Sequence, residues 1–400
     1  LIPVAEDKSR SAICLVEPWA CVEDSYATVE RQTIKVGGKL LVVADAGYAI
    51  TGLAESFSAE GKPASIAAIT ADSAQLLPLK SLGIPVETAD LNVLPEKCFD
   101  DVVYFGVNPD TIEKLNPTLG NNAIINIVTA GQKIGRPVQI GVGRIHYGCT
   151  RWIGTLTGNA ADSYGMIPAS GEVRPNDNCL IIGAGGPMGQ MHVIRVLCSG
   201  VAGLEVVATD FDGPRLDALK AMTQPLADAN KVSLRMVNTK DAKLTEKFSY
   251  IAVMAPVSAV VAQAVVDASS NSIVNVFAGI PAPTLHPFDL NTIIEKRCFL
   301  FGTSGSTTRD MKIVLDKVQG NQLDTNLSVD AVSGMAGGGD GIGAVEKRTL
   351  SGKIIVYPQL HNLGLTPLAT IAQALPTVAA LLNNGKWTKA AEEELLKVVR

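Results

Sequence analysis

Residues that bind metals or form disulfides are scarce in this sequence. It contains only four histidines, and its seven cysteines are scattered along the chain without a CxxC pair. A zinc site needs about three or four protein ligands placed as a tetrahedron, and no such cluster stands out. An odd, dispersed set of cysteines is typical of free thiols in a reducing compartment, so we expect a cytoplasmic protein.

Basic clusters and long apolar runs are missing as well. The net charge is −5 with 34 lysines and arginines, and no segment forms a basic block, so we expect no nucleic-acid partner. The longest apolar stretches, such as ALPTVAALL near residue 380, are too short to span a bilayer. No signal peptide is visible, and we expect no membrane partner. The chain opens on LIPVAEDKSR, without methionine, and we expect processing or an upstream part.

The chain contains two similar halves. Its 400 residues, 47% hydrophobic with 37 glycines and 21 prolines, predict an α/β protein of more than one domain. In the second half NCLIIGAGGPMGQ, LEVVATDFDGPRLDALKAM and a segment ending FLFGTSGST follow in order. In the first half KLLVVADAGYAITG, ASIAAITADSAQLLPLKSLG and a segment ending RWIGTLTG match them. The offset, about 140 residues, is that of a domain rather than a solenoid repeat.

Short apolar runs in both halves predict strands. They do not alternate with polar residues and are separated by helical segments, which indicates parallel sheets buried on both faces. These runs are 40–43, 65–69, 101–105 and 124–128, then 179–183, 205–209, 250–254 and 273–277. We therefore predict two tandem Rossmann-like, doubly wound parallel sheets, followed by a mostly helical C-terminal segment.

The glycine-rich turn of the second half predicts a dinucleotide site. Backbone N–H groups at a helix N-terminus bind a pyrophosphate, and glycines let it approach closely. Asp210 ends the next strand, where an acid accepts both ribose hydroxyls and repels a 2′-phosphate, which predicts NAD over NADP. Arg215 either flanks the adenine or is a surface charge. The turn itself, with alanine in place of the first glycine, comprises Ala184, Gly185, Gly186, Pro187, Met188 and Gly189.

The first half fails the same tests. Asp45 lies within its turn and would repel a phosphate, and Thr70 and Gln75 stand where Asp210 and Arg215 stand in the second half. We interpret this half as a degenerate copy with a structural role. We also hypothesise that the strands near Trp152 and Phe299 pair, so that the tandem domains form an internal pseudo-dimer; a homo-oligomer is a further expectation.

Several motifs resemble the medium-chain, zinc-type alcohol dehydrogenase superfamily, and most of all its sugar-phosphate reductases of the L-sorbose-1-phosphate reductase kind. They lie in residues 15–35 and 177–360, and the first nucleotide-like copy is an insertion relative to the family plan. The motifs are LVEPWACVEDSY, GGPMGQMHV, VNTK, FAGIP, FGTSGST, DMK and LSGKIIVYP.

The resemblance implies an NAD-dependent alcohol or polyol dehydrogenase of the EC 1.1.1 type. A hydride would pass between the nicotinamide and a polyol, sugar or sugar phosphate. The nicotinamide would lie against Ala255 to Val257 and Phe277 to Gly279. The family's zinc is held by ligands of an upstream domain, and Glu17 matches a glutamate at or near that zinc. Cys14 and Cys21 flank Glu17, and we expect them to be buried thiols.

This resemblance also implies a division of the chain. It places the end of a catalytic domain and a connecting helix in 1–35, the degenerate domain in 36–157 and a connector in 158–176. The NAD-binding domain would occupy 177–310, and the segment 311–400 would return to the domain body.

Two alternatives to a zinc enzyme remain open. The chain is either a non-catalytic NAD-binding scaffold or sensor, or a zinc-independent reductase that activates the substrate carbonyl by pre-organised hydrogen bonds.

Two further features of the sequence have more than one interpretation. The glycine-rich stretch 333–345 is interpreted as a mobile loop rather than a phosphate cradle, because no strand leads into it. The cluster around His146 and Arg151 either closes a domain interface or holds a sugar phosphate.

Overall fold

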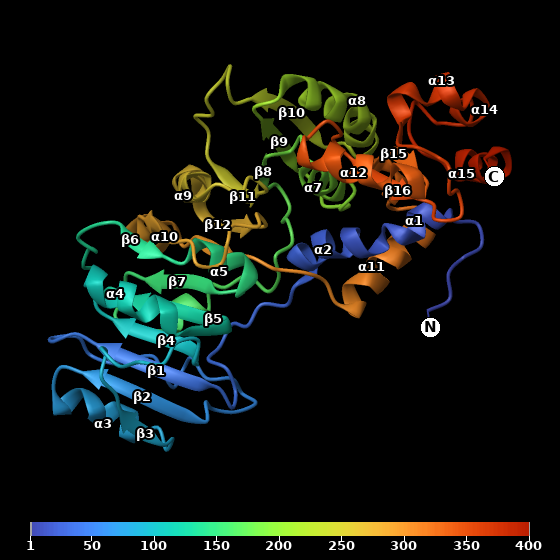
Figure 1. The fold of residues 1–400 in the computed structure, drawn as a ribbon. Coiled ribbons are helices and arrows are strands. Elements are labelled where there is room, and N and C mark those ends of the chain that lie inside the picture. The colour runs from blue at the N-terminus through green and yellow to red at the C-terminus, as the bar shows by residue number, and fades with distance from the viewer. Residues whose placement is uncertain (1, 400) are drawn as a thin grey trace. The chain divides into compact units, whose positions relative to one another are not determined.

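The computed structural model describes residues 2–399, in which helices and strands alternate along the chain (Figure 1). The predicted α/β class is confirmed. Contacts divide the chain into two compact units. The glycine-turn unit comprises Leu1–Asp24, Ile181–Lys243 and Gly305–Arg400, and the large-sheet unit comprises Ser25–Leu180 and Leu244–Ser304. The predicted domain boundaries stay a prediction, because this grouping by contact does not locate the ends of a repeat.

The first half of the chain forms a doubly wound sheet within the large-sheet unit. Its strands lie in the order β3-β2-β1-β4-β5-β7, and every neighbouring pair is parallel. The predicted apolar runs 40–43, 65–69, 101–105 and 124–128 fall inside four of these strands. The strands are β1 (Lys39–Ala44), β2 (Ser65–Thr70), β3 (Val86–Thr88), β4 (Phe99–Phe105), β5 (Leu119–Val128) and β7 (Arg151–Thr155).

Three strands of the second half continue this sheet. They are β11 (Phe248–Val253), β12 (Ala268–Val276) and β14 (Phe299–Phe301), in the order β11-β12-β14. Strand β14 pairs antiparallel with β7 through Leu300 and Trp152. The strands near Trp152 and Phe299 therefore pair, as the hypothesis requires. That the tandem domains form an internal pseudo-dimer stays a proposal.

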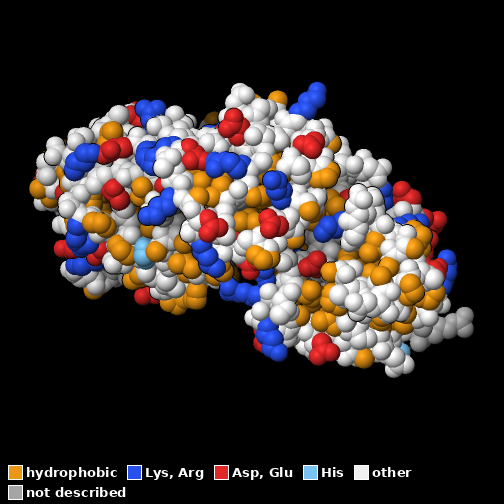
Figure 2. Space-filling model, turned by 90° about the horizontal axis from the view of Figure 1, so that it is seen from above, with side chains coloured by type: hydrophobic (Ala, Val, Ile, Leu, Met, Phe, Trp, Pro, Cys, Tyr) orange, Lys and Arg blue, Asp and Glu red, His pale blue; other side chains and the backbone are white. Residues whose placement is uncertain are grey.

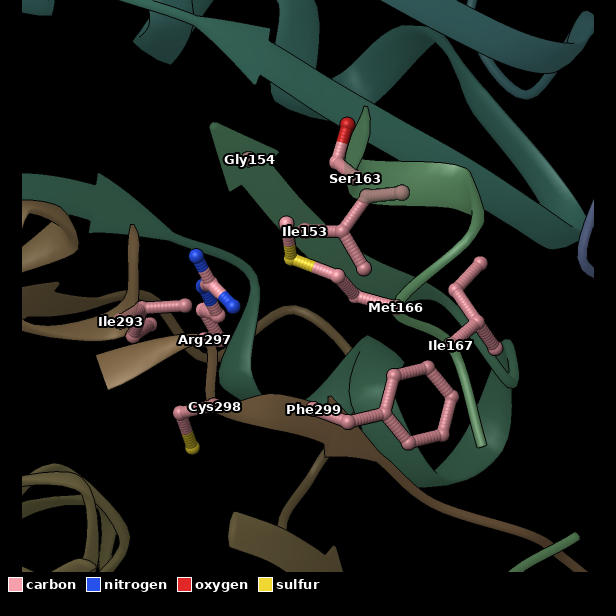
Figure 3. Close-up of a pocket in the computed structure, with 9 residues that line it drawn as sticks. All are labelled: Ile153, Gly154, Ser163, Met166, Ile167, Ile293, Arg297, Cys298 and Phe299. Carbon is pink, nitrogen blue, oxygen red and sulfur yellow. The ribbon is translucent and has the colours of Figure 1, made fainter. Parts of the chain in front are cut away.

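The junction between β7 and β14 is closely packed. Figure 3 shows side chains from β7, from 163–167 and from 293–299 converging there on a small cavity. Its volume is about 10 Å³, and a cavity of roughly 10–15 Å³ holds about one water molecule. This cavity is consequently too small for a ligand larger than a water molecule.

Two tyrosines from the repeated DSY triplet tie the halves together in the large-sheet unit. The Tyr26 ring stacks on Tyr250 of β11, with ring centroids 5.7 Å apart. The Tyr164 hydroxyl donates to the buried Asp101 carboxylate of β4 at 2.9 Å. Each triplet precedes one half and contacts a strand of the other half, so the two halves are interlocked rather than merely adjacent.

The glycine-turn unit contains the strands that carry the predicted dinucleotide site. Their order is β10-β9-β8. Helix α7 is almost entirely buried, which fits its packing against the sheet. These elements are β8 (Asn178–Ile182, whose last two residues belong to this unit), α7 (Pro187–Leu197), β9 (Glu205–Asp210), α8 (Gly213–Asn230) and β10 (Ser233–Asn238).

The two ends of the chain contribute short helices and a second sheet to the glycine-turn unit. The C-terminal part is mostly helical, as predicted, but it also holds a three-stranded sheet in the order β16-β15-β17. The helical structure between 366 and 387 consists of short pieces, one of which begins at Pro376. The elements are α1 (Arg10–Cys14), α2 (Val16–Ala27), α11 (Thr308–Gln319), β15 (Val329–Ser333), α12 (Gly338–Glu346), β16 (Lys353–Val356), β17 (Thr366–Pro367), α13 (Ile371–Ala374), α14 (Pro376–Ala379) and α15 (Lys389–Val398).

The interpretation of 333–345 as a mobile loop is wrong. Strand β15 leads into it, and most of it forms helix α12. Two of its glycines serve close packing: a Cβ on Gly334 would lie 1.6 Å from the Leu360 carbonyl oxygen, and one on Gly337 2.2 Å from the Leu365 nitrogen. Glycine lowers helix propensity by about 1 kcal/mol per residue. Here tertiary contacts outweigh that preference.

The face of the molecule in Figure 2 shows lysine and arginine side chains interspersed with acidic ones, without a single basic field. Among residues 2–399, no helix combines the length and the apolar composition needed to cross a membrane.

Candidate functional site

The glycine-rich turn joins β8 to α7 as the sequence predicts. Gly183 has a φ of +81°, a left-handed conformation that glycine adopts readily. The backbone nitrogens of Gly183 and Ala184 both donate to the Thr209 carbonyl at 2.9 Å, which fastens the turn to β9. Gly186 caps the helix, and Pro187 opens its first turn. The N-terminal N–H groups of α7 thus begin directly at the turn.

The glycines of the turn have different roles. A Cβ on Gly189 would lie 2.2 Å from the Gly183 carbonyl oxygen and 2.6 Å from the Ala184 Cα. Only glycine therefore lets the helix pack this closely on the turn. A Cβ on Gly186 would meet its nearest atom at 3.7 Å, an ordinary contact. The space beside Gly186 is the part of the turn that a phosphate could approach.

Asp210 is bonded directly to the turn. Its Oδ2 accepts the Gly185 backbone N–H at 2.9 Å. Its Oδ1 accepts the backbone N–H groups of Phe211 at 2.8 Å and of Asp212 at 3.1 Å. The structure therefore brings together the two parts of the predicted site, the turn and the acid, in one unit.

Arg215 points toward the segment after α12. Its guanidinium donates to the backbone carbonyls of Arg348 and Leu350, and its side chain is 17% exposed. Asp212 lies 3.8 Å away. The side chain is thus held in place by backbone acceptors, and its predicted contact with an adenine stays a prediction.

A cluster beside the turn was not predicted. Lys353, at the start of β16, donates to the Met188 sulfur at 3.5 Å. On α2, Glu17 accepts from the Cys21 thiol at 3.5 Å and from the Ser306 hydroxyl at 3.3 Å. We call these five residues the lysine cluster. The motif LSGKIIVYP pointed to the strand, but nothing in it indicated that distant residues meet Lys353.

Burial changes the proton affinity of two members of the lysine cluster. It lowers the pKa of Lys353, while Cys21 and Glu17 oppose that shift when they are charged. It raises the pKa of the Cys21 thiol, with Glu17 adding to the shift and the Ser306 hydroxyl opposing it. Cys21 is therefore held as a neutral thiol, and Lys353 becomes neutral at a lower pH than an ordinary lysine.

The described residues do not form a zinc site. Within 2–399, no group of three or more histidine, cysteine, aspartate or glutamate side chains is placed to hold a metal ion. Glu17 bonds to Cys21 and Ser306, and its predicted place at or near a zinc stays a prediction. The expectation that both flanking cysteines are buried is wrong, because Cys14, at the end of α1, is exposed and Cys21 is only partly buried.

The residues predicted to contact a nicotinamide lie in the large-sheet unit. Ala255 and Val257 follow β11, and the Val257 nitrogen donates to the Ala255 carbonyl at 2.8 Å. Phe277 follows β12, and its nitrogen donates to the Val253 carbonyl at 3.1 Å. Ala255, Val257 and Phe277 therefore lie just beyond the carboxyl ends of two parallel strands. Within this fold type, ligands bind at that end of the sheet.

The first half contributes side chains to the Phe277 region. The helix α5 (Val142–Tyr147) places the His146 ring 5.9 Å from the Phe277 ring. The Tyr147 hydroxyl lies so close to Gly279 that a Cβ there would be 3.0 Å from it. Tyr147 is 52% exposed, so its ring borders solvent at this point. Sequence reasoning assigned Tyr147 no specific role, because Gly279 is far from it in the chain.

The other charged residues of the His146 cluster pack rather than bind. Arg151 donates to both oxygens of Glu30, at 2.9 and 2.7 Å, and both side chains are buried. Burial lowers the pKa of His146, so the ring is neutral. This arrangement supports the interface interpretation. His192 on α7 is fully buried, and burial together with Arg195 lowers its pKa to about 3, so it packs as a neutral ring.

The first half lacks the helix that a phosphate site requires. Residues 46–64 after β1 form no α-helix, whereas α7 follows β8 directly in the second half. Asp45 accepts a hydrogen bond from the Tyr104 hydroxyl at 2.5 Å. The Gln75 amide donates to the carbonyls of Asp45 and Tyr48, both at 2.8 Å. Asp45 and Gln75, which correspond to parts of the dinucleotide site in the second half, therefore form hydrogen bonds that stabilise the first-half loop.

Comparison with known proteins adds sequence relatives to this geometry. An L-sorbose 1-phosphate reductase of Klebsiella pneumoniae is 26% identical over 244 residues, 56% of either chain. The resemblance to a sugar-phosphate reductase is confirmed. The uncharacterized protein YggP of Escherichia coli K12 is 28% identical over 250 residues, 56% of this chain and 57% of that protein. The chain thus spans about half the length of the curated relatives it matches.

Other comparisons are less informative. No protein-family model matches the chain. Among solved structures, L-idonate 5-dehydrogenase of Escherichia coli is 13% identical with a TM-score of 0.37, covering 46% of this chain and 50% of that one. An alcohol dehydrogenase of Thermus is 17% identical with a TM-score of 0.38, over 46% and 54%. Likenesses at these TM-scores carry no argument about function.

Proposed function

We propose that this chain carries the cofactor-binding part of an oxidoreductase that transfers a hydride between NAD and a polyol, sugar or sugar phosphate. The arrangement of the glycine-rich turn, α7 and Asp210 within one unit carries this proposal. The similarity to L-sorbose 1-phosphate reductase supports the substrate class.

The adenosine and pyrophosphate contacts follow from the turn. The N–H groups at the start of α7 would bind the pyrophosphate beside Gly186 and Met188, where the helix dipole favours negative charge. Lys353 would add a positive charge close to Met188. The Asp210 carboxylate would accept the ribose hydroxyls and disfavour a 2′-phosphate, hence NAD over NADP.

The chemistry at the substrate rests on the resemblance. When bound, the nicotinamide supplies or accepts the hydride, and Ala255, Val257, Phe277 and Gly279 would orient it. Because the described residues do not fit zinc, zinc assistance would need ligands other than those in 2–399, and no zinc step is derived. A zinc-independent reductase and a non-catalytic NAD-binding sensor are the alternatives. A homo-oligomer and a cytoplasmic location also remain proposals.

Replacing Asp210 with asparagine should weaken NADH binding and relax the choice of cofactor. Asparagine keeps an acceptor for the Gly185 N–H but removes the charge that strengthens bonds to ribose hydroxyls. We expect NADH to bind about 5- to 10-fold more weakly, which corresponds to about 1 kcal/mol. NADPH should bind no worse than before.

The measurement is fluorescence titration of both cofactors. Asp217→Asn, on helix α8, is the matched control. If neither NADH nor NADPH bound the unaltered chain at millimolar concentration, the proposed function would be wrong.

Replacing Lys353 with methionine should remove a pH dependence of cofactor binding. The charged lysine favours the pyrophosphate, so affinity should fall as pH rises through its lowered pKa, below the ordinary value of 10.5. In Lys353→Met the affinity should be about 3- to 10-fold lower near neutral pH and flat from about pH 7 to 10. Lys347→Met, at the exposed end of α12, should keep the original profile. Identical profiles for all three proteins would contradict the role of Lys353.

A further inference from the structure

The first half of the chain contains a cavity that the cofactor proposal does not use. Its volume is about 630 Å³, within the range of roughly 300–1,000 Å³ that small-molecule sites occupy. It lies wholly in the large-sheet unit, where β1, β4 and β5 end. The lining comes from the loop after β1, from Phe105 and Val107, from 128–132 and from Gly158.

This position is the switch point of the first-half sheet. In the order β3-β2-β1-β4-β5-β7, the direction of strand succession reverses between β1 and β4. The chain leaves these two strands toward opposite faces, which opens a crevice beyond their carboxyl ends, and ligands of doubly wound sheets bind there. No α-helix follows β1 within 46–64. After β4, the first N–H groups of α4 (Pro109–Leu115) are already capped by the Asn108 side chain.

The lining excludes an anionic ligand. None of the described residues that line the cavity is a lysine, arginine or histidine. The neighbouring cations are engaged elsewhere, Lys133 with Glu295 and Arg136 with Glu113. Asp45 immediately precedes the lining residue Ala46, and no lining side chain supplies a positive charge to offset its repulsion of a phosphate.

The same lining suits an uncharged ring compound. Most of its side chains are apolar, and the polar ones are neutral: Tyr48, Thr51 and Gln132. The Tyr48 hydroxyl donates to the Thr129 carbonyl at 3.3 Å, which steadies its ring beside the cavity. Aromatic side chains favour planar rings, and the Thr51 hydroxyl and the Gln132 amide can both donate and accept hydrogen bonds.

The site is also pre-formed. Tyr104 bridges the Asp45 carboxylate and the Asn108 backbone N–H, at 2.5 and 2.9 Å. On the opposite rim Ala130 has a φ of +50°, a left-handed conformation that costs a non-glycine residue energy. Such conformations persist where the surroundings impose them, and they are frequent at ligand sites.

From these observations we propose that the first half binds an uncharged nucleoside in this cavity. The sheet order provides the crevice, the apolar lining receives the base, and the neutral polar side chains of Tyr48, Thr51 and Gln132 would bond to ribose hydroxyls. The absence of phosphate-binding groups restricts the ligand to the nucleoside itself. This site is separate from the dinucleotide turn and does not rest on the proposed function.

The test is calorimetric titration of the full chain with adenosine, with and without saturating NADH. We expect one adenosine per chain in both conditions and at least about tenfold weaker binding of AMP, because its phosphate meets no cation. Val107→Trp should fill the cavity and abolish adenosine binding while leaving NADH binding unchanged. Val93→Trp, at an exposed position of the same half, should bind adenosine like the unaltered chain.

Three outcomes would overturn the proposal. No adenosine binding at millimolar concentration would exclude the ligand class. Displacement of adenosine by NADH would place it in the second half. Equal affinities for adenosine and AMP, or unchanged binding by a folded Val107→Trp chain, would show that this lining does not select the ligand.

Discussion

Gly189→Ala should abolish most cofactor binding and destabilise the glycine-turn unit. The new Cβ, fixed to its Cα, would lie 2.2 Å from the Gly183 carbonyl oxygen, a backbone atom that cannot move independently. Relieving the overlap must separate α7 from the turn, which shifts the N–H groups that would bind the pyrophosphate. Overpacking typically costs about 1–3 kcal/mol. If this cost must be met again when NADH binds, NADH should bind about 5- to 150-fold more weakly.

Fluorescence titration of NADH, with circular dichroism to establish folding, measures both effects. Gly343→Ala is the matched control, because a Cβ at this position of α12 meets nothing within 4 Å. It should leave NADH affinity unchanged and raise stability by up to about 1 kcal/mol, since alanine favours a helix over glycine. A Gly189→Ala chain that is folded and binds NADH normally would show that the close approach is not required.

Glu23→Ala should lower the free energy of unfolding by about 3–5 kcal/mol, the usual cost of leaving a buried charge without its partner. Glu23 on α2 accepts from Arg195 on α7 at 3.0 and 2.9 Å, and from Lys317 on α11 at 2.6 Å. The side chains of Glu23 and Arg195 are only 3% and 5% exposed. Removing the carboxylate would leave the Arg195 charge buried with Lys317 close by.

The same network sets a pH dependence. Burial raises the pKa of Glu23, but Arg195 and Lys317 outweigh it, and the net pKa lies below the ordinary value of 4.5. A folded-state pKa below the unfolded one stabilises the fold above pH 4.5, and this contribution disappears as pH falls through the lower value. Glu23→Gln, which cannot titrate, should flatten that part of the stability profile.

Urea unfolding across pH 3 to 7 is the measurement. The double variant Glu23→Leu with Arg195→Met is the informative companion, because apolar residues of similar volume often replace a buried ion pair at little cost. It should be more stable than Glu23→Ala. Equal losses in both variants would show that side-chain volume, not the unpaired charge, determines the effect.

The lysine cluster shows what sequence reasoning could not reach. Glu17 was selected as a metal ligand because of its motif, which stays a prediction, and its partners in the structure are Cys21 and Ser306. Lys353 opens a strand, a position where a lysine is ordinarily exposed. Its neighbour Met188 is 165 residues away in the sequence. Local patterns contain no information on such partners, so this cluster required the structure.

The sequence by itself determined the eight strands marked by apolar runs, the glycine-rich turn and the acid that follows it. Each depends on a few consecutive residues: apolar runs without alternation, glycines before a helix, and Asp210 at the end of the next strand. The tertiary structure alone decided that 333–345 contains a helix, that Lys353 lies beside Met188, and that the crevice of the first half is open. These features arise from contacts between segments distant in the chain, where packing outweighs local preference.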